Sequence, residues 1–241
     1  MIQRCMKNWL RDLGDIFLPD ACTLCRVILD KSNPRLCCDF CWQALPRIEQ
    51  PCRHCAQPVL DGDLCGQCLL RPLTRGIAVA PLSYESDAVN LVHQLKFSAS
   101  LRAARTLSRA LCERLVTVYL DQPLPDVIVP TPLSWRRHVQ RGYNQCDRLS
   151  LELAAALDLP VQHLLRRRHG TVQHGQSRSA RARQPRRSFQ LAKVPIPAHV
   201  ALVDDVITTG TTMGNMAHTL SRAGVRRVDL WAPCRATAIR L

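Results

Sequence analysis

No run of apolar residues in the 241-residue sequence reaches the length of a membrane-spanning helix. Charged residues interrupt the apolar positions near the N-terminus, so that stretch also lacks the uninterrupted core of a signal peptide. Its spacing instead predicts one amphipathic helix over residues 1–20. We therefore expect a cytoplasmic protein that does not insert into a membrane.

Acidic residues are missing altogether between Leu159 and Val203. The formal net charge of +14 lies in residues 71–241, because residues 1–70 hold equal numbers of acidic and basic residues. Such concentrated positive charge predicts a polyanion or a phosphorylated ligand, although a merely solvated basic loop remains an alternative. The candidate nucleic-acid contacts are Arg166, Arg167, Arg168, Arg178, Arg181, Arg183, Arg186 and Arg187, and Lys193 completes the basic segment.

Aromatic residues are scarce, at 5% of the sequence. Only Trp135, Tyr143 and Phe189 lie near the basic segment in the sequence. Base stacking and sequence-specific readout are therefore disfavoured, whereas salt-sensitive binding to the backbone of single-stranded DNA is favoured.

Cysteine, in contrast, is abundant, with 13 residues. In a reducing compartment, paired thiols are read first as metal ligands, and two CxxC pairs complete a tetrahedral Cys₄ zinc site. We predict two structural zinc ions in a double zinc ribbon over residues 21–70, with iron–sulfur ligation as the weaker alternative. The eight ligands are Cys22, Cys25, Cys38, Cys41, Cys52, Cys55, Cys65 and Cys68.

The spacing leaves two questions about the cysteines open. The four pairs fit both sequential and cross-braced pairing, and Cys37 adjoins Cys38 as a competing ligand. The remaining thiols are expected to be small buried side chains: Cys5, Cys112, Cys146 and Cys234. Because the ribbon lacks a basic surface, we interpret it as a structural or protein-docking module rather than a nucleic-acid contact.

Residues 71–241 alternate between strand-like and helix-like patterns. The spacing predicts strands over 76–82, 126–131, 161–165, 200–203 and 228–232, helices over 87–97, 101–120, 144–157 and 210–223, and an Arg-rich loop over 166–190. This alternation indicates an α/β domain with a parallel sheet flanked by helices.

The run VALVDDVITTGTT, Val200 to Thr212, is the most specific motif. Its apolar strand places Asp204 and Asp205 at the carboxyl edge of the sheet, where they can accept hydrogen bonds from ribose hydroxyls. The following turn offers backbone N–H groups, hydroxyls and a helix N-terminus to a phosphate, with glycine allowing a close approach. The turn residues are Thr208, Thr209, Gly210, Thr211 and Thr212.

This run resembles the signature loop of type I phosphoribosyltransferases. The resemblance implies a type I phosphoribosyltransferase-like domain that binds phosphoribosyl pyrophosphate with Mg²⁺. By the same resemblance, VPTPL at Val129–Leu133 looks like the pyrophosphate loop, with Pro130 and Thr131 as contacts.

Over nearly its full length the chain resembles the ComF family of competence and DNA-utilization proteins. The four CxxC pairs, HQLKF (93–97), VPTPL, RGYNQ (141–145), the Arg-rich run 173–189 and VDDVITTGTT carry this resemblance in order. It implies a role in the uptake or use of external DNA, and it makes Lys96 and Arg141 candidate contacts to the pyrophosphate ligand.

Two rival functions remain open. In an active phosphoribosyltransferase, Asp204 or Asp205 would serve as base, with Mg²⁺ and Arg141 stabilising the leaving pyrophosphate. No acceptor-binding hood is evident, since only residues 234–241 follow the last predicted strand. As a scaffold, the ribbon and the N-terminal helix would dock a helicase or another DNA-processing partner.

Overall fold

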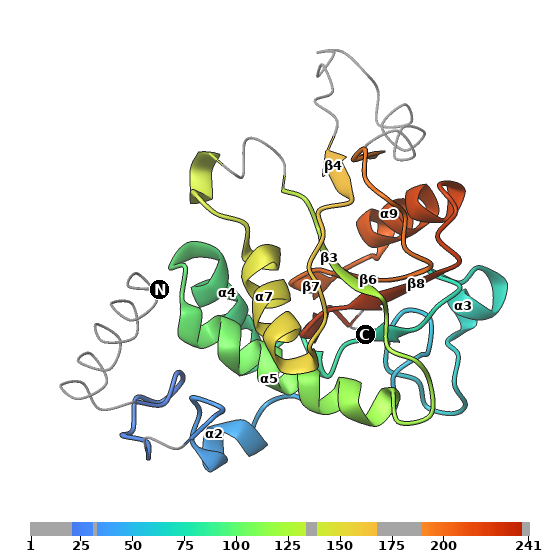
Figure 1. Cartoon of the computed structure of the whole chain (residues 1–241). Coiled ribbons are helices and arrows are strands. Elements are labelled where there is room, and N and C mark those ends of the chain that lie inside the picture. Colours follow the sequence, from blue (N-terminus) through green and yellow to red (C-terminus); the bar gives the residue numbers. More distant parts are fainter. Residues whose placement is uncertain (1–20, 31–32, 134–138, 168–188, 238–241) are drawn as a thin grey trace, which may run out of the picture.

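The structure is a computed structural model that describes residues 21–30, 33–133, 139–167 and 189–237 (Figure 1). The predicted N-terminal helix, Cys5 and Trp135 lie outside the described residues. So do six of the eight candidate arginines: Arg168, Arg178, Arg181, Arg183, Arg186 and Arg187.

A four-stranded parallel sheet forms the centre of the molecule, and its strand order is β1-β8-β6-β3. The strands are β1 (Ala78–Val79), β3 (Val127–Pro130), β6 (His199–Val203) and β8 (Arg227–Trp231). All four are largely buried, as expected of a parallel sheet with both faces covered.

Helices cover both faces of this sheet (Figure 1). On one face lie α4 (Ser86–Phe97), α5 (Leu101–Val118) and α7 (Gln145–Leu157), and on the other lies α9 (Thr211–Arg222). A hydrophobic cluster lies on each face of the sheet, and alternate residues of β6 belong to different clusters. Ala201 and Val203 belong to the cluster on the α4–α5–α7 side, whereas Val200 and Leu202 belong to the one on the α9 side. The predicted parallel sheet flanked by helices is confirmed.

Local capping explains where two of the helices begin. The Ser100 side chain accepts a hydrogen bond from the amide of Ala103 at the start of α5, and Asn144 accepts one from the amide of Cys146 at the start of α7. At its other end α7 stops at Asp158, which has a left-handed backbone conformation with φ 54°.

Two small sheets differ from the sequence prediction. β2 (Leu82–Ser83), β9 (Cys234–Arg235) and β7 (Val206–Ile207) form a parallel set in the order β2-β9-β7. The predicted strand over 76–82 is therefore wrong as one element: it is divided between β1 and β2, on either side of a break that includes Pro81, which has no amide hydrogen to donate.

The predicted Arg-rich loop over 166–190 is also wrong at its two ends. Arg166 and Arg167 belong to β4 (Leu165–Arg167), which pairs antiparallel with β5 (Phe189–Leu191). The apolar side chains of Leu165 and Phe189 are buried in the core on the α9 side, and this burial favours the strand pairing.

The cysteine-rich segment lies against the helices and the sheet, and its two short helices are α2 (Asp39–Gln43) and α3 (Gly66–Leu70). Cys22, Cys41 and Trp42 share one hydrophobic core with residues of α4 and α5. Cys52, Cys55 and Cys68 form a separate cluster that includes Leu73. Among the helices that the structure describes, none combines the length and apolar content needed to cross a bilayer.

Candidate functional site

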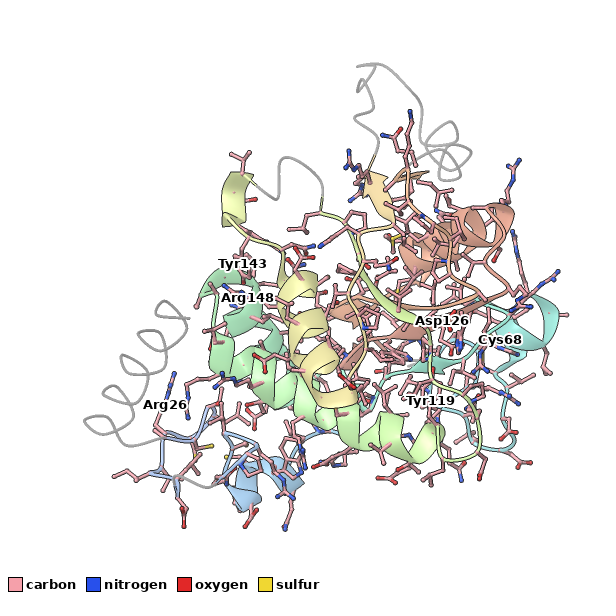
Figure 2. The ribbon with its side chains drawn as sticks, in the orientation of Figure 1. Arg26, Cys68, Tyr119, Asp126, Tyr143 and Arg148 are labelled. Carbon is pink, nitrogen blue, oxygen red and sulfur yellow. The ribbon has the colours of Figure 1, made fainter. Side chains whose placement is uncertain are left out.

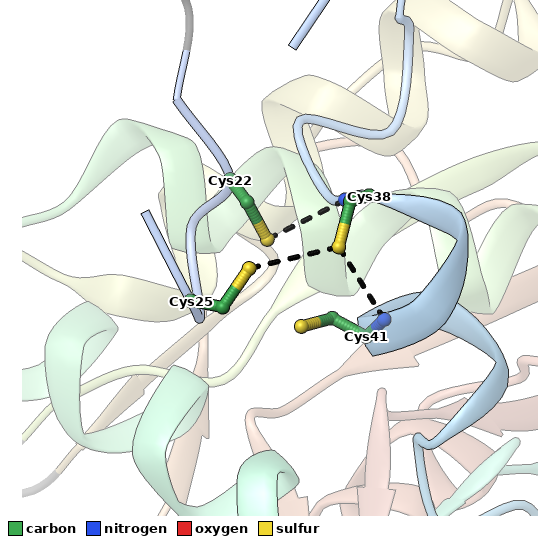
Figure 3. Close-up of side chains that lie close together, drawn as sticks. All are labelled: Cys22, Cys25, Cys38 and Cys41. Carbon is green, nitrogen blue, oxygen red and sulfur yellow. Dashed lines mark hydrogen bonds between the residues drawn. The ribbon is translucent and has the colours of Figure 1, made fainter. Parts of the chain in front are cut away.

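Two cysteine tetrads form in sequential order. Figure 3 shows the first, Cys22, Cys25, Cys38 and Cys41, and the second consists of Cys52, Cys55, Cys65 and Cys68. In each tetrad the sulfur atoms lie within 4.8 Å of one another. Pairing in the structure is thus sequential and not cross-braced.

The tetrads fit zinc. Four thiolates at about 2.3 Å from a tetrahedral Zn²⁺ are separated by about 3.8 Å, and the Sγ atoms of Cys25 and Cys38 are 3.6 Å apart, as are those of Cys55 and Cys65. Backbone amides also donate to sulfur, with Cys38 N 3.4 Å from Cys22 Sγ. Cys37 lies outside the tetrad, although its Sγ is 3.9 Å from that of Cys22.

A polar cluster lies at the carboxyl ends of β3 and β6. Asp204 and Asp205 follow β6, and Thr131 follows β3 with its amide 2.8 Å from the carbonyl oxygen of Val203. Lys96 from the end of α4 and Gln145 from the start of α7 approach Asp205. The structure therefore brings together predicted site residues that are far apart in the sequence.

Asp205 is buried and has a partner on each carboxylate oxygen. Only 5% of the residue is exposed. Lys96 Nζ lies 3.0 Å from Oδ1, and Gln145 Nε2 donates to Oδ2 at 2.8 Å. The Lys96 ammonium thus lies in direct contact with this carboxylate and balances its charge.

Asp204 is half-buried and has different surroundings. Its Oδ1 accepts hydrogen bonds from the Asp205 amide at 2.9 Å and from the Cys146 thiol at 3.3 Å. Burial, and next the charge of Asp205, raise the pKa of Asp204 to about 7. Burial likewise raises the pKa of Cys146, so this side chain is a thiol that can donate to the carboxylate.

Several buried polar atoms around the carboxyl pair have no hydrogen-bond partner among the described residues. They include Thr131 Oγ1, Arg141 Nη1 and Gln145 Oε1. Arg141 also stacks over Phe97, with Cζ 5.3 Å from the ring centre. Because buried polar atoms are rarely left unpaired, this cluster has free donors and acceptors for a polar ligand.

The threonine-rich turn precedes α9. Thr208, Thr209, Thr211 and Thr212 are exposed around the helix N-terminus, and the hydroxyls of Thr209 and Thr211 are 3.0 Å apart. Gly210 has φ 73°, which favours glycine. A Cβ at Gly210 would lie 2.4 Å from Leu73 Cδ2, so the close approach observed here is that of Leu73.

Two arginines of the basic segment lie within the described residues. Arg166 and Arg167 are exposed on β4, and Arg167 Cζ lies 5.7 Å from the Phe189 ring centre. The remaining six candidate arginines lie outside the described residues.

Three residues near the predicted loops were not assigned to the site from the sequence. Gln145 stood in the RGYNQ motif, but nothing marked its amide as a partner of Asp205. Cys146 is buried as predicted, yet its contact with Asp204 depends on the packing of α7 beside β6. Arg235, buried in β9 near the turn, has no motif around it that could have identified its contacts.

Comparisons with known proteins agree with these motifs. A family described as a double zinc ribbon domain matches residues 13–69. The chain is 36% identical to DNA utilization protein YhgH of Salmonella typhi over 224 residues, which cover 90% of this chain and 98% of the relative. It is 34% identical to competence protein F of Haemophilus influenzae over 193 residues, covering 77% of this chain and 84% of the relative.

Solved structures are similar at a lower level. The structure of the allosteric regulatory enzyme of purine biosynthesis aligns with a TM-score of 0.40 at 17% identity and covers 59% of this chain. The alignment spans only 30% of that enzyme's length. By the identity and coverage of its relatives, and with the double zinc ribbon in place, the chain belongs to the ComF family of DNA utilization protein YhgH and competence protein F.

Proposed function

We propose that this protein acts in the cytoplasm in the uptake or use of external DNA and binds phosphoribosyl pyrophosphate with Mg²⁺ at the carboxyl ends of β3 and β6. The names of its relatives support the first part. The second part rests on the carboxyl pair, near which buried polar atoms of Thr131, Arg141 and Gln145 have no hydrogen-bond partner within the portion of the chain that the structure describes.

Each group has a chemical role in this proposal. Asp204, the more exposed carboxyl group, and Asp205 accept hydrogen bonds from the ribose hydroxyls, and the Asp205 amide donates to Asp204. Hydroxyls and amides of Thr208–Thr212 bind the 5′-phosphate at the start of α9. Pro130, Thr131, Arg141 and Lys96 face the pyrophosphate, whose charge Mg²⁺ neutralises when bound.

Lys96 connects the ligand-free and ligand-bound states in this proposal. Its ammonium group is 3.0 Å from Asp205 and only partly exposed. A pyrophosphate group offers a stronger negative charge than one carboxylate, so Lys96 turns from Asp205 to the ligand. Asp205 then becomes available to the ribose.

Single-stranded DNA is the second proposed ligand. The acid-free segment begins two residues after α7 and its described arginines, Arg166 and Arg167, are exposed on β4. Such a surface provides salt-dependent contacts to phosphates.

A protein partner is a separate part of the proposal. Exposed apolar side chains of the ribbons, such as Phe40 and Leu70, favour docking of a helicase or another DNA-processing partner.

The test of the ligand site is a binding titration by calorimetry. Phosphoribosyl pyrophosphate with Mg²⁺ is titrated into the wild type, Asp204→Ala/Asp205→Ala, and a control in which two exposed acidic residues elsewhere are replaced, Glu49→Ala/Asp121→Ala. We expect affinity to fall at least tenfold in the first variant and to stay within twofold in the control. Unchanged binding in the first variant would refute the site.

One observation favours a second function, an active phosphoribosyltransferase. A carboxyl group with a pKa of about 7, such as Asp204, is suited to act as a general base near neutral pH. The test is pyrophosphate release from phosphoribosyl pyrophosphate with each nucleobase as acceptor. Turnover that Asp204→Asn abolishes would establish this function, and its absence with every acceptor would leave the binding function alone.

A further inference from the structure

A buried arginine connects the second cysteine tetrad to the threonine-rich turn. Arg235 lies in β9 and only 4% of it is exposed. Its Nε donates to the carbonyl oxygen of Cys55 at 2.7 Å, in the second tetrad. Its Nη1 donates at 2.8 Å to the carbonyl oxygen of Ile207 and also contacts that of Thr208.

The backbone of β9 reinforces this connection. Cys234 and Arg235 pair in parallel with Val206 and Ile207 of β7, the strand that leads directly into the turn. The Ala236 amide donates to the Ile207 carbonyl oxygen at 2.9 Å. Gln57, two residues after Cys55, donates to the Ala236 carbonyl oxygen at 3.0 Å. The chain entering the turn is therefore fixed by both backbone and guanidinium hydrogen bonds.

Leu73 provides a second contact between the segment after the tetrad and the turn. It belongs to the hydrophobic cluster of Cys52, Cys55 and Cys68. Its side chain lies where a Cβ at Gly210 or at Gly214 would be, at 2.4 Å and 2.9 Å respectively. The turn is thus connected to the second tetrad through Arg235, where β7 enters the turn, and to the segment after that tetrad through Leu73, which lies against Gly210 and Gly214.

The first tetrad contacts helices α4 and α5. Cys22 and Cys41 belong to the core with α4 and α5, and Thr106 of α5 donates to the hydroxyl of Thr23 at 3.3 Å. The two tetrads therefore have different neighbours, which makes the first a natural control for the second.

We propose that Arg235 is a positioning residue for the ligand site, and that the second ribbon acts through it to hold Thr208–Thr212 in the phosphate-binding conformation. This inference rests on the proposed binding of phosphoribosyl pyrophosphate. The planar guanidinium donates to the Cys55 and Ile207 carbonyl oxygens from two nitrogen atoms in a fixed geometry, which the single ammonium nitrogen of lysine does not reproduce, so lysine is a poor substitute.

Zinc in the second tetrad gives this arrangement an electrostatic basis. A zinc ion with four thiolates carries a net charge of about −2, and this charge would lie near a guanidinium group that is almost fully removed from water. A buried cation needs such compensation. We therefore expect the turn to loosen when the second tetrad is damaged.

Hydrogen–deuterium exchange of the amides in Val206–Thr212, without ligand, tests the positioning role directly. The variants are Arg235→Met and Arg235→Lys. The control is Arg227→Met, which removes a partly buried arginine at the start of β8, where it pairs with Asp229. We expect exchange in the turn to accelerate at least tenfold in Arg235→Met, less in Arg235→Lys, and not at all in Arg227→Met. If Arg235→Met does not fold, Arg235→Lys carries the comparison.

The same variants are then titrated with phosphoribosyl pyrophosphate and Mg²⁺. The dissociation constant should rise at least tenfold in Arg235→Met and less than twofold in Arg227→Met. Exchange as slow as in the wild type, or equal acceleration in Arg227→Met, would overturn the positioning role. A wild type that does not bind the ligand would contradict the proposed function instead, and the exchange comparison would still decide the role of Arg235.

The tetrads are compared through Cys65→Ser and Cys25→Ser, with zinc content measured by mass spectrometry. Each variant should hold one zinc ion fewer than the wild type. Faster exchange at Val206–Thr212 is expected in Cys65→Ser alone, and equal effects of the two variants would overturn the link to the second ribbon.

Discussion

At the scale of single residues, Asp204 and Asp205 are neighbours with opposite surroundings. Asp205 has an ammonium group and an amide as partners on its two oxygens. Asp204 has no described cation in direct contact, and burial beside Asp205 raises its pKa to about 7. A change of pH between 6 and 8 therefore changes the charge of one member of the pair.

This difference predicts pH-dependent binding of phosphoribosyl pyrophosphate. The carboxylate form of Asp204 accepts hydrogen bonds from ribose hydroxyls, and this form predominates above a pKa of about 7. Affinity should rise severalfold from pH 6 to pH 8, as measured by calorimetry in buffers of equal ionic strength. Asp204→Asn should bind at least tenfold more weakly at pH 8 and lose this part of the pH dependence. An unchanged pH profile in the variant would contradict the assignment.

A second residue-scale prediction concerns Tyr119, labelled in Figure 2 at the end of α5. Its hydroxyl donates to Asp229 at 2.6 Å and accepts from the Trp231 indole at 3.0 Å. Tyr119→Phe removes a hydrogen bond to a buried carboxylate, so it should lower the free energy of unfolding by about 1.5–3 kcal/mol at pH 7. Denaturant unfolding measures this loss.

The pH dependence of that loss follows from Asp229. Burial alone would raise its pKa, but hydrogen bonds from His199, Arg227, Tyr119 and the Ile77 amide lower the pKa below the ordinary value. A lowered carboxyl pKa contributes stability above the unfolded-state pKa, and this contribution is lost as pH falls through the folded-state value. The difference between the wild type and Tyr119→Phe should therefore begin to shrink as the pH falls below about 4 and vanish once Asp229 is protonated in the folded wild type. A difference that stays constant after Asp229 is protonated would contradict this explanation.

Residues in local motifs could be predicted from the sequence, and residues that act across the fold could not. The aspartates and threonines of Val200–Thr212 stand together because one strand and one turn present them all. Gln145 and Arg235 contribute through contacts with chain segments 60 and 28 residues away, and such pairings depend on tertiary packing. A buried arginine at the end of a short strand carries no local signal.

At the scale of elements, strand β4 of the β4–β5 pair carries the two described arginines of the basic segment, and the exposed Lys193 follows β5. If Arg166 and Arg167 contact DNA phosphates, Arg166→Gln/Arg167→Gln should weaken single-stranded DNA binding uniformly across sequences. The slope of log affinity against log salt should decrease by about 0.7 for each lost contact. Fluorescence anisotropy over a range of salt concentrations measures both quantities.

The control for this experiment is Arg71→Gln/Arg75→Gln, which removes the same charge from two exposed positions after α3. Its slope should equal that of the wild type. An equal decrease in both double variants would indicate a general charge effect and reject the β4–β5 surface as the binding site.

Long elements were easier to predict than short ones. The predicted helices over 87–97, 101–120, 144–157 and 210–223 each correspond to a helix, because their apolar residues recur at helical spacing. The two-residue strands β2, β7 and β9 are too short to show an alternating pattern. The β4–β5 pair was missed since its polar arginines outweighed the buried Leu165 and Phe189.

At the scale of the whole molecule, the first ribbon and the helices share one core. Trp42 is buried in the cluster that contains residues of α4, α5 and α7. Trp42→Ala should therefore cost about 3–5 kcal/mol and lower the melting temperature of the whole protein in one transition. Phe40→Ala, at a side chain that is 82% exposed in the same short helix, should change stability by less than about 0.5 kcal/mol.

Scanning calorimetry distinguishes cooperative unfolding of the whole protein from independent unfolding of the ribbon. Two separate transitions, of which only one moves in Trp42→Ala, would show that the ribbon unfolds by itself. A single transition that moves as a whole would show that residues 21–70 and 71–241 depend on each other for stability.

The order of the sheet also has a kinetic consequence. β1 obtains its partner in the sheet only when β8 is present, and the contact between Ile77 and Asp229 joins residues 152 positions apart. The Arg235 contact with Cys55 spans 180 positions. Closing such long loops before their contacts can form makes folding slow, so refolding from denaturant should be limited by the arrival of β8 and β9 rather than by zinc capture in the ribbons.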